Sequence, residues 1–323
     1  MVIGLVLGVL SGSALVEAQQ AGKVYRIGLL DYGSPEAGRV KWWKAFRERL
    51  RDLDYVEGRN VSFEPRWGRG NRDQLQTQAA ELVALKVDVI VTASGAASIA
   101  AKRATSTIPI VSTIGPDPVG LGIVTSLARP GGNVTGLTSI SSELSGKRLE
   151  LVRAIAPRAS RVAILWHEGS PGNQLNVKET EAAAGLLGAT LQAVGVRGPE
   201  EFDRTFQLMR RDGAGAVLIV PNAMFFTHRK RLGTLALNHR LISIVGSREY
   251  VEAGGLASYA TDFPHLFRRA AEYVDRVVKG ANPSDMPIEQ PTKFELIINL
   301  QTAKALGLTI PESVLLRADE VIR

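Results

Sequence analysis

Two stretches of the chain, residues 87–120 and 216–249, repeat one order of segments. In each, a strand-like apolar run ends in a small polar loop that opens a helix, and a second apolar run ends in another polar loop. The four loops are residues 93–96, 115–120, 221–223 and 246–249. Open parallel sheets bind ligands at the carboxyl ends of their strands. Two such units that face each other across a cleft would therefore hold one small molecule.

Strand and helix patterns alternate along the rest of the chain. Strands are expected from Val24 and from Arg161, and helices at 174–187, from Ala223 to about Arg240, and after Pro199 with Phe202, Phe206 and Met209 inward. One helical stripe comprises Ala37, Val40, Trp43, Phe46, Leu50 and Leu53. Short apolar runs joined by helices predict parallel sheets that are covered on both faces. Because 323 residues exceed the usual size of one core, we expect two doubly wound parallel-sheet lobes of the α/β class.

The last sixty residues depart from this plan. A helix begins at Phe263 and ends at Gly280, and residues 282–287 have the composition of a linker. This helix could return the chain to the first lobe before it ends on the second. We expect a multi-strand hinge, with residues 24–137 plus 260–285 in the first lobe and residues 138–259 plus 286–323 in the second.

The N-terminus predicts export. Residues 2–16 form an uncharged apolar run, and Val16-Glu-Ala18 is typical of a signal-peptidase site. We expect residues 1–18 to be a signal peptide that is cleaved near Ala18, and the mature chain to be periplasmic. Since no Lys or Arg precedes the run, a mis-assigned start or an uncleaved anchor stays open, as does a buried helix, which Gly4, Gly8 and Gly12 disfavour. The absence of cysteine excludes a Cys-anchored lipoprotein.

Charge and motifs argue against several function classes. The formal net charge is +7, but basic and acidic residues are interleaved, as at residues 47–52, and no nucleic-acid-binding motif occurs. The four histidines lack the spacing of a metal site, and there is no nucleophile elbow or phosphate-binding loop. His239 fits the packed end of a helix, and His167 fits either a loop or the cleft. We expect no catalytic residue, no metal, no cofactor and no nucleic acid.

Several longer motifs occur in a characteristic order. They are Tyr25–Gly28, Tyr55–Asn60, Ile108–Val111, Asp117–Gly120, Arg129–Gly136, Lys147–Leu151, Arg248–Gly255, Ser258-Tyr259, Pro291–Leu300 and Lys304–Pro311. In these motifs the chain resembles the ABC-transporter substrate-binding protein family, whose better-known members bind aromatic amino acids such as tryptophan. The resemblance covers essentially the whole mature chain.

The resemblance implies a fold and a role. The fold would be the type I periplasmic binding fold, in which two lobes close on a ligand by hinge motion. The role would be to bind a small carboxylated ligand, such as an amino acid, and to deliver it to the membrane permease of an ABC importer, as a monomer and without chemistry on the ligand. The alternative is a clamp of the same fold that presents its ligand to a separate receptor or regulator.

The resemblance also implies where the ligand would lie. In the first lobe the ligand residues would be Asp31, Tyr32 and Ser34, then Ser94, Gly95 and Ala96, and then Asp117; in the second they would be Asn222, Ser247 and Arg248. Free N–H groups after Ser94 would suit a carboxylate, and Asp117 an ammonium group. Both residues also fit local roles, Ser94 as a helix N-cap and Asp117 as a turn residue.

One loop departs from the family pattern. Small polar residues are usual after the strand that ends at Pro221, whereas this chain has Asn222-Ala-Met-Phe-Phe226. Met224, Phe225 and Phe226 fit either an apolar ligand pocket or the first turn of a core helix. The ligand is therefore left open at this point.

Overall fold

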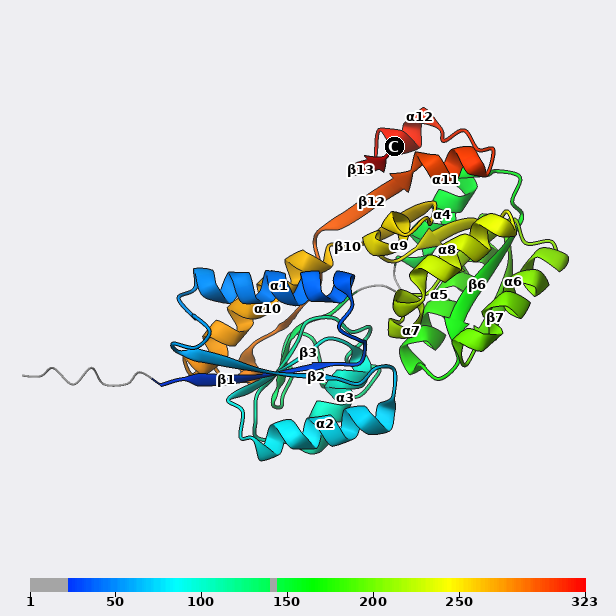
Figure 1. Cartoon of the computed structure of the whole chain (residues 1–323). Helices are drawn as coiled ribbons and strands as arrows, with labels where there is room; N and C mark the ends of the chain where they lie inside the picture. Colours follow the sequence, from blue (N-terminus) through cyan, green and yellow to red (C-terminus); the bar gives the residue numbers. More distant parts are fainter. Residues whose placement is uncertain (1–22, 140–143) are drawn as a thin grey trace, which may run out of the picture.

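A computed structural model describes residues 23–139 and 144–323, and it forms two α/β lobes (Figure 1). The chain passes between the lobes three times, after strands β5, β10 and β11, as a multi-strand hinge requires. The signal peptide expected at residues 1–18 lies outside the described residues. Within the described part of the chain, no helix is long and apolar enough to span a membrane.

The first lobe is a six-stranded sheet with the strand order β11-β5-β4-β3-β1-β2, in which every pairing is parallel. Helices α1 and α10 cover one face of this sheet, and α2 and α3 cover the other (Figure 1). The elements are β1 (Tyr25–Asp31), α1 (Ala37–Asp52), β2 (Val61–Trp67), α2 (Arg72–Ala84), β3 (Val89–Thr92), α3 (Gly95–Ala104), β4 (Ile110–Ser112), β5 (Val134–Leu137), α10 (Phe263–Val278), η2 (Pro283–Asp285) and β11 (Ile288–Glu289).

The second lobe is a seven-stranded sheet with the order β13-β12-β10-β9-β8-β6-β7. Its elements are α4 (Ser145–Ile155), β6 (Arg161–His167), α5 (Pro171–Leu187), β7 (Thr190–Val196), η1 (Pro199–Glu201), α6 (Phe202–Arg211), β8 (Ala216–Ile219), α7 (Ala223–Thr227), α8 (Arg229–Asn238), β9 (Ile242–Val245), α9 (Arg248–Glu252), β10 (Ala257–Thr261), β12 (Phe294–Asn299), α11 (Leu300–Ala305), α12 (Glu312–Leu315) and β13 (Glu320–Ile322).

The predicted fold class, two doubly wound α/β lobes, is confirmed, with one exception to the all-parallel sheets. Strand β12 pairs antiparallel with β10, whereas the other pairings of this sheet are parallel. The exception arises because β12 enters directly from the first lobe and not through a crossover helix of its own lobe. Phe202, Phe206 and Met209 are fully buried, as predicted.

The single helix expected from Ala223 to Arg240 is two helices, α7 and α8. The break falls at His228, whose backbone (φ −97°, ψ 15°) leaves the helical region. The Arg229 side chain donates a 2.8 Å hydrogen bond to the Phe226 carbonyl at this break. A side-chain donor therefore satisfies a carbonyl that a continuous helix would bond internally.

Helix α1 buries a wider face than its stripe predicts. Trp43, Phe46 and Leu50 are buried in the first lobe as expected, but Val40 is 47% exposed, so that part of the prediction is wrong. Trp42 is buried instead, at 2% exposure. A helix that contacts two lobes buries two stripes, and the hydrophobic period of one stripe does not indicate the second.

The crossings between the lobes lie slightly beyond their expected positions. Residues 260 and 261 end β10 in the second sheet, and residues 288 and 289 form β11 in the first sheet. We therefore propose that the lobe boundaries lie near residues 262 and 290.

Candidate functional site

A cavity of about 460 Å³ lies between the two lobes. In each sheet the strand order reverses at one point, which lies between β1 and β3 in the first sheet and between β6 and β8 in the second. At this point the carboxyl ends of the two strands lie side by side. The carboxyl ends of these four strands and the loops that follow them contribute Tyr32, Ser94, His167 and Asn222 to the cavity wall. This is the position at which open α/β sheets bind ligands.

Four of the expected first-lobe residues line the cavity: Tyr32, Ser94, Gly95 and Ala96. Ser94 is the N-cap of α3, and its hydroxyl accepts a 3.1 Å hydrogen bond from the Ala97 N–H. The N-cap role of Ser94 is therefore real, and it leaves the N–H groups of Gly95 and Ala96 at the start of a ten-residue helix. The positive end of this helix faces the cavity.

Asp31 does not line the cavity. It is 1% exposed, and its carboxylate accepts hydrogen bonds from Arg39 Nη1 at 2.6 Å, from the Gly33 N–H at 2.8 Å and from Trp43 Nε1 at 3.0 Å. Arg39, which does line the cavity, is thereby held in place by a buried ion pair. The charges of Asp31 and Arg39 compensate each other.

Ser34 and Asp117 are also absent from the cavity wall. Ser34 lies in the loop before α1, where its carbonyl accepts from the Glu36 N–H. Asp117 has a φ of 37°, and its Oδ1 accepts a 2.8 Å hydrogen bond from the Gly120 N–H. This is the turn geometry that the sequence left open as the second interpretation of Asp117. Its neighbour Pro116 lines the cavity instead.

Two of the three expected second-lobe residues, Asn222 and Ser247, line the cavity. The Asn222 side chain caps α7, where Oδ1 accepts from the Met224 N–H at 2.8 Å. Its Nδ2 lies 3.4 Å from His167 Nδ1 and 3.4 Å from Asn173 Oδ1. Asn222 thus joins a polar group whose other two members, His167 and Asn173, also line the cavity.

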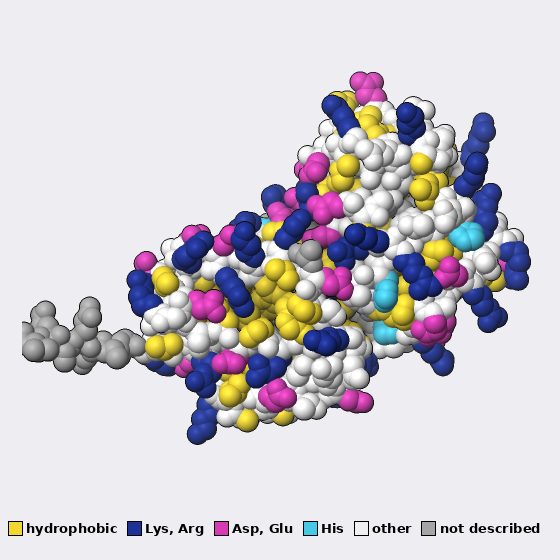
Figure 2. All heavy atoms as spheres, in the orientation of Figure 1, with side chains coloured by type: hydrophobic (Ala, Val, Ile, Leu, Met, Phe, Trp, Pro, Cys, Tyr) yellow, Lys and Arg dark blue, Asp and Glu magenta, His cyan; other side chains and the backbone are white. Residues whose placement is uncertain are grey.

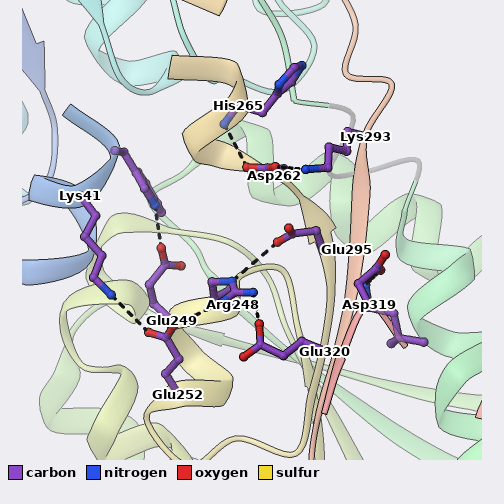
Figure 3. A network of polar contacts seen from close by, with 12 residues as sticks. Lys41, Arg248, Glu249, Glu252, Asp262, His265, Lys293, Glu295, Asp319 and Glu320 are labelled. Carbon is purple, nitrogen blue, oxygen red and sulfur yellow. Dashed lines mark hydrogen bonds and ion pairs between the residues drawn. The ribbon is translucent and has the colours of Figure 1, made fainter. Parts of the chain in front are cut away.

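Arg248 lies elsewhere, in a network of carboxylates from three elements (Figure 3). Its guanidinium group lies 3.6 Å from Glu252 and 3.7 Å from Glu295, and it also bonds Glu320. These contacts connect α9 with β12 and β13 within the second lobe. The side chain of Arg248 therefore stabilises that lobe and does not face the cavity.

The cavity also has residues that were not among the expected ligand residues. His167, for which a loop role and a cleft role were both open, lines it, together with Trp42, Arg39, Arg72 and Asn173. Burial lowers the pKa of His167 below its ordinary value, and the positive charge of Arg72 lowers it further. The sequence contained a signal for the position of His167, because this residue ends the first strand of the second lobe, as Asp31 ends the first strand of the first lobe.

Phe225 and Phe226 are both core residues and cavity residues, so the two interpretations of their loop hold together. They are 2% and 8% exposed, and both line the cavity, whereas Met224 does not. The ring of Phe226 lies 5.1 Å from that of Trp42, and the Arg39 guanidinium group lies 5.7 Å from the Phe226 ring. One wall of the cavity is therefore an aromatic cluster that both lobes build.

The lobes touch on both sides of the cavity. On one side Trp42 Nε1 donates to Glu249 at 2.6 Å, and Arg229 pairs with Glu36 at 2.8 Å. On the other side the Arg72 side chain bonds the Gly169 carbonyl, and a Cβ on Gly172 would lie 2.6 Å from Pro116. Such contacts exist only when two lobes are closed upon each other.

Charged residues around the cavity favour an anion. Arg72 and Arg103 line it, and in the described part of the chain neither has a carboxylate partner of the kind that Asp31 gives Arg39. Among the described lining residues the acidic side chain is that of Asp73, which is exposed at the rim. On the face drawn in Figure 2, by contrast, acidic and basic side chains are interspersed. Within residues 23–139 and 144–323, no group of His, Cys, Asp and Glu could hold a metal ion.

Comparisons with known proteins agree with this geometry. Residues 36–322 match the family model described as ABC transporter substrate binding protein. A tyrosine-binding protein of Clostridioides difficile (strain R20291) is 29% identical over 266 residues, which are 82% of this chain and 76% of that protein.

Solved structures extend the likeness to both lobes. The ABC domain in complex with L-Trp from Streptococcus pneumonia is 26% identical, with a TM-score of 0.87 over 93% of this chain and 100% of that one. A conserved domain protein from Vibrio cholerae is 25% identical, with the same TM-score and the same coverage of both chains. The fold is that of the type I periplasmic binding proteins.

Proposed function

The chain belongs to the ABC transporter substrate-binding protein family, and we propose that it is the exported solute-binding component of an ABC importer. In this role it would hold one small carboxylated ligand, an amino acid or a similar molecule, between its lobes and deliver it to a membrane permease. The family is one of solute-binding proteins and not of enzymes. Closure around a ligand is the whole of the protein's task, and no chemistry on the ligand is needed.

The observation that carries the proposal is the cavity between closed lobes. Its volume of about 460 Å³ lies in the ~300–1,000 Å³ range of small-molecule sites. A ligand in this cavity contacts both lobes only in the closed form, so its binding free energy favours closure. Such coupling is what allows a permease to distinguish a loaded protein from an empty one.

The wall of the cavity supports a carboxylate on the ligand. The N–H groups of Gly95 and Ala96 begin α3 and are well placed to receive an anion. Arg72 and Arg103 add positive charge at the rim. Asn222, His167 and Asn173 offer polar groups from the second lobe.

The aromatic wall supports a flat apolar group on the same ligand. Trp42, Phe225 and Phe226 supply it, and aromatic rings contribute strongly to the binding of other rings. The relative from Clostridioides difficile binds tyrosine, and the related structure from Streptococcus holds L-Trp. We therefore propose an aromatic amino acid, or an aromatic carboxylate of similar size, as the ligand.

Export completes the proposal. Residues 1–18 would be removed near Ala18, and the mature chain would act in the periplasm as a monomer. The apolar run at residues 2–16 supports this assignment.

A ligand screen on the mature chain, residues 19–323, tests the proposal. We expect L-tryptophan, L-tyrosine or a related carboxylate to raise the melting temperature, because a ligand that binds only the folded state stabilises it. Isothermal titration calorimetry would then give the affinity. If no member of a broad panel of amino acids and carboxylates stabilises the chain, the proposal fails.

A matched pair of variants ties such binding to this cavity. Ala96 and Ala104 lie on the same helix, but only Ala96 lines the cavity. Ala96→Leu should abolish binding because it fills the cavity, whereas Ala104→Leu should leave the affinity unchanged. Equal binding by both variants would place the ligand elsewhere.

A further inference from the structure

Trp42 and Glu249 meet across the two lobes, although 207 residues separate them in the chain. The indole Nε1 of Trp42, on α1, donates a 2.6 Å hydrogen bond to Oε1 of Glu249, on α9. The two residues are 2% and 6% exposed. A short hydrogen bond between two buried groups of different lobes belongs to the closed form alone.

The two partners belong to different cavities. Trp42 is part of the aromatic wall of the main cavity, whereas Glu249 lines a second cavity between the lobes, of about 310 Å³. Glu249 itself is absent from the wall of the main cavity. Any effect of Glu249 on a ligand there must therefore be indirect, and Trp42 is the residue of the main cavity wall to which Glu249 is hydrogen-bonded.

We propose that Glu249 is a positioning residue for ligand capture, because it fixes the Trp42 ring in the cavity wall as the lobes close. The inference rests on the proposed function for the identity of the ligand. The closure of the two lobes that it describes does not depend on that function. Without an acceptor, the buried indole N–H would lose a hydrogen bond that it makes with water in the open form. Glu249 thus favours the closed form and the orientation of the ring together.

The packing around this bond leaves little room for other arrangements. A Cβ on Gly38 would lie 3.0 Å from Glu249 Cγ, and the Trp42 ring is in contact with Phe226 and Phe263 at centroid distances of 5.1 and 4.7 Å. Because the ring is held on several sides, its N–H can reach an acceptor in one direction only. Glu249 occupies that direction.

Charged groups face Glu249 from several elements, including Glu295 on β12, Arg268 on α10 and Asp262 before it, which line the same second cavity. Glu252 and Arg248 lie on its own helix α9, Lys41 on α1, and Arg229 on α8, where it pairs with Glu36. Burial raises the pKa of Glu249 above its ordinary value and Glu252 raises it further, while the bond from Trp42 and the charge of Arg229 act in the opposite direction. The effect of burial is the largest of these.

A pH dependence of ligand affinity follows. Opening wets Glu249 and returns its pKa toward the ordinary value of about 4.3, so the closed form binds a proton more readily than the open form. Closure is therefore favoured at low pH, and affinity falls as the pH rises through the window between the ordinary pKa and the raised one.

The decisive variants are Glu249→Gln and Glu249→Leu, which are both uncharged and similar in size. Glutamine keeps an acceptor for Trp42 and leucine does not, so Glu249→Gln should bind L-tryptophan or L-tyrosine about tenfold more tightly than Glu249→Leu, as one hydrogen bond to a buried donor implies. Glu249→Gln should also lose the pH dependence. Equal affinities, or an unchanged pH dependence, would overturn the proposal.

Trp42→Phe supplies the control, since phenylalanine keeps a ring but has no N–H. In the Trp42→Phe background, the ratio of affinities between Glu249→Gln and Glu249→Leu should fall to about one. This cycle isolates the interaction between the two side chains. A ratio that stays near tenfold would show that Glu249 acts through another group.

A direct measurement of closure separates this inference from the proposed function. The chain has no cysteine, so spin labels on Arg51→Cys and Lys230→Cys, which are exposed positions in different lobes, report the distance between the lobes. Even if neither amino acid binds, the ligand-free Glu249→Gln protein should have a larger closed population than Glu249→Leu. Equal populations would overturn the inference whatever the ligand is.

Discussion

Gly38 and Phe226 lie so close across the lobes that a Cβ on residue 38 would be 2.5 Å from Cζ of the phenylalanine ring. Phe226 is 8% exposed and is packed between Trp42 and two arginines, so its ring has little freedom to withdraw. A side chain at residue 38 would therefore hold the lobes apart. The glycine is needed by the closed form and not by the helix in which it lies.

Gly38→Ala should accordingly separate closure from stability. Alanine stabilises a helix by about 0.5–1 kcal/mol relative to glycine, so the ligand-free melting temperature should stay the same or rise, while ligand affinity falls at least tenfold because the closed form is strained. Calorimetry and thermal unfolding measure the two quantities. Gly185→Ala is the matched control, since an added Cβ there meets nothing within 4 Å; equal affinities for the two variants would contradict the prediction.

The buried pair of Arg39 and Asp31 should be important for the stability of the first lobe. Arg39→Met leaves the Asp31 carboxylate buried without its 2.6 Å partner, and we expect a loss of about 3–5 kcal/mol in the free energy of unfolding. Urea denaturation would measure it. The double variant Arg39→Met with Asp31→Asn should recover part of this loss, because no unpaired charge is then buried; no recovery would indicate that packing, and not charge, dominates.

Asp117 should behave as a turn residue. Asp117→Ala removes the acceptor of the Gly120 N–H and places an alanine at φ 37°, so we expect a loss of about 1 kcal/mol in stability with ligand affinity nearly unchanged. Asp117→Asn keeps the acceptor and suits the backbone, and it should match the parent chain in both measurements. A large drop in affinity for both variants, at unchanged melting temperature, would restore Asp117 as a ligand residue.

His167 should make stability depend on pH. Because its pKa is lowered in the folded chain, the unfolded chain binds a proton more readily. The free energy of unfolding should therefore decrease as the pH falls through the window between the ordinary histidine value, about 6.5, and the lowered one, and it should be constant above that window. Urea denaturation at a series of pH values would show this decrease, and His167→Gln should reduce it. An identical pH dependence in the variant would assign the effect to other groups.

Local patterns predicted much of the cavity wall. Ser94, Gly95, Ala96, Asn222 and Ser247 follow strands whose apolar runs and helical crossovers are plain in the sequence. Parallel strands order their carboxyl ends along one edge of a sheet, so residues at these ends come together without knowledge of any distant contact. For Ser94 and Asn222 even the capping of the next helix follows from the local sequence.

Other residues that we expected at the ligand do not line the cavity, because their side chains point in another direction. Asp31 ends a strand as expected, yet it turns to Arg39 and Trp43 inside the first lobe. Arg248 begins a helix at the correct strand end, yet it turns to Glu295 and Glu320, residues from the end of the chain. Neither direction has a local signal, since the partners are set by the packing of separate elements.

The sequence by itself determined two α/β units, the loops at the ends of their strands and the family to which the chain belongs, because hydrophobic period and motif order are local properties. Only the tertiary structure decided that Trp42, and not Val40, is buried, and that it meets Glu249 across the lobes. The physical reason is that closure brings together residues 207 positions apart. The energy of that contact depends on burial that neither lobe provides alone.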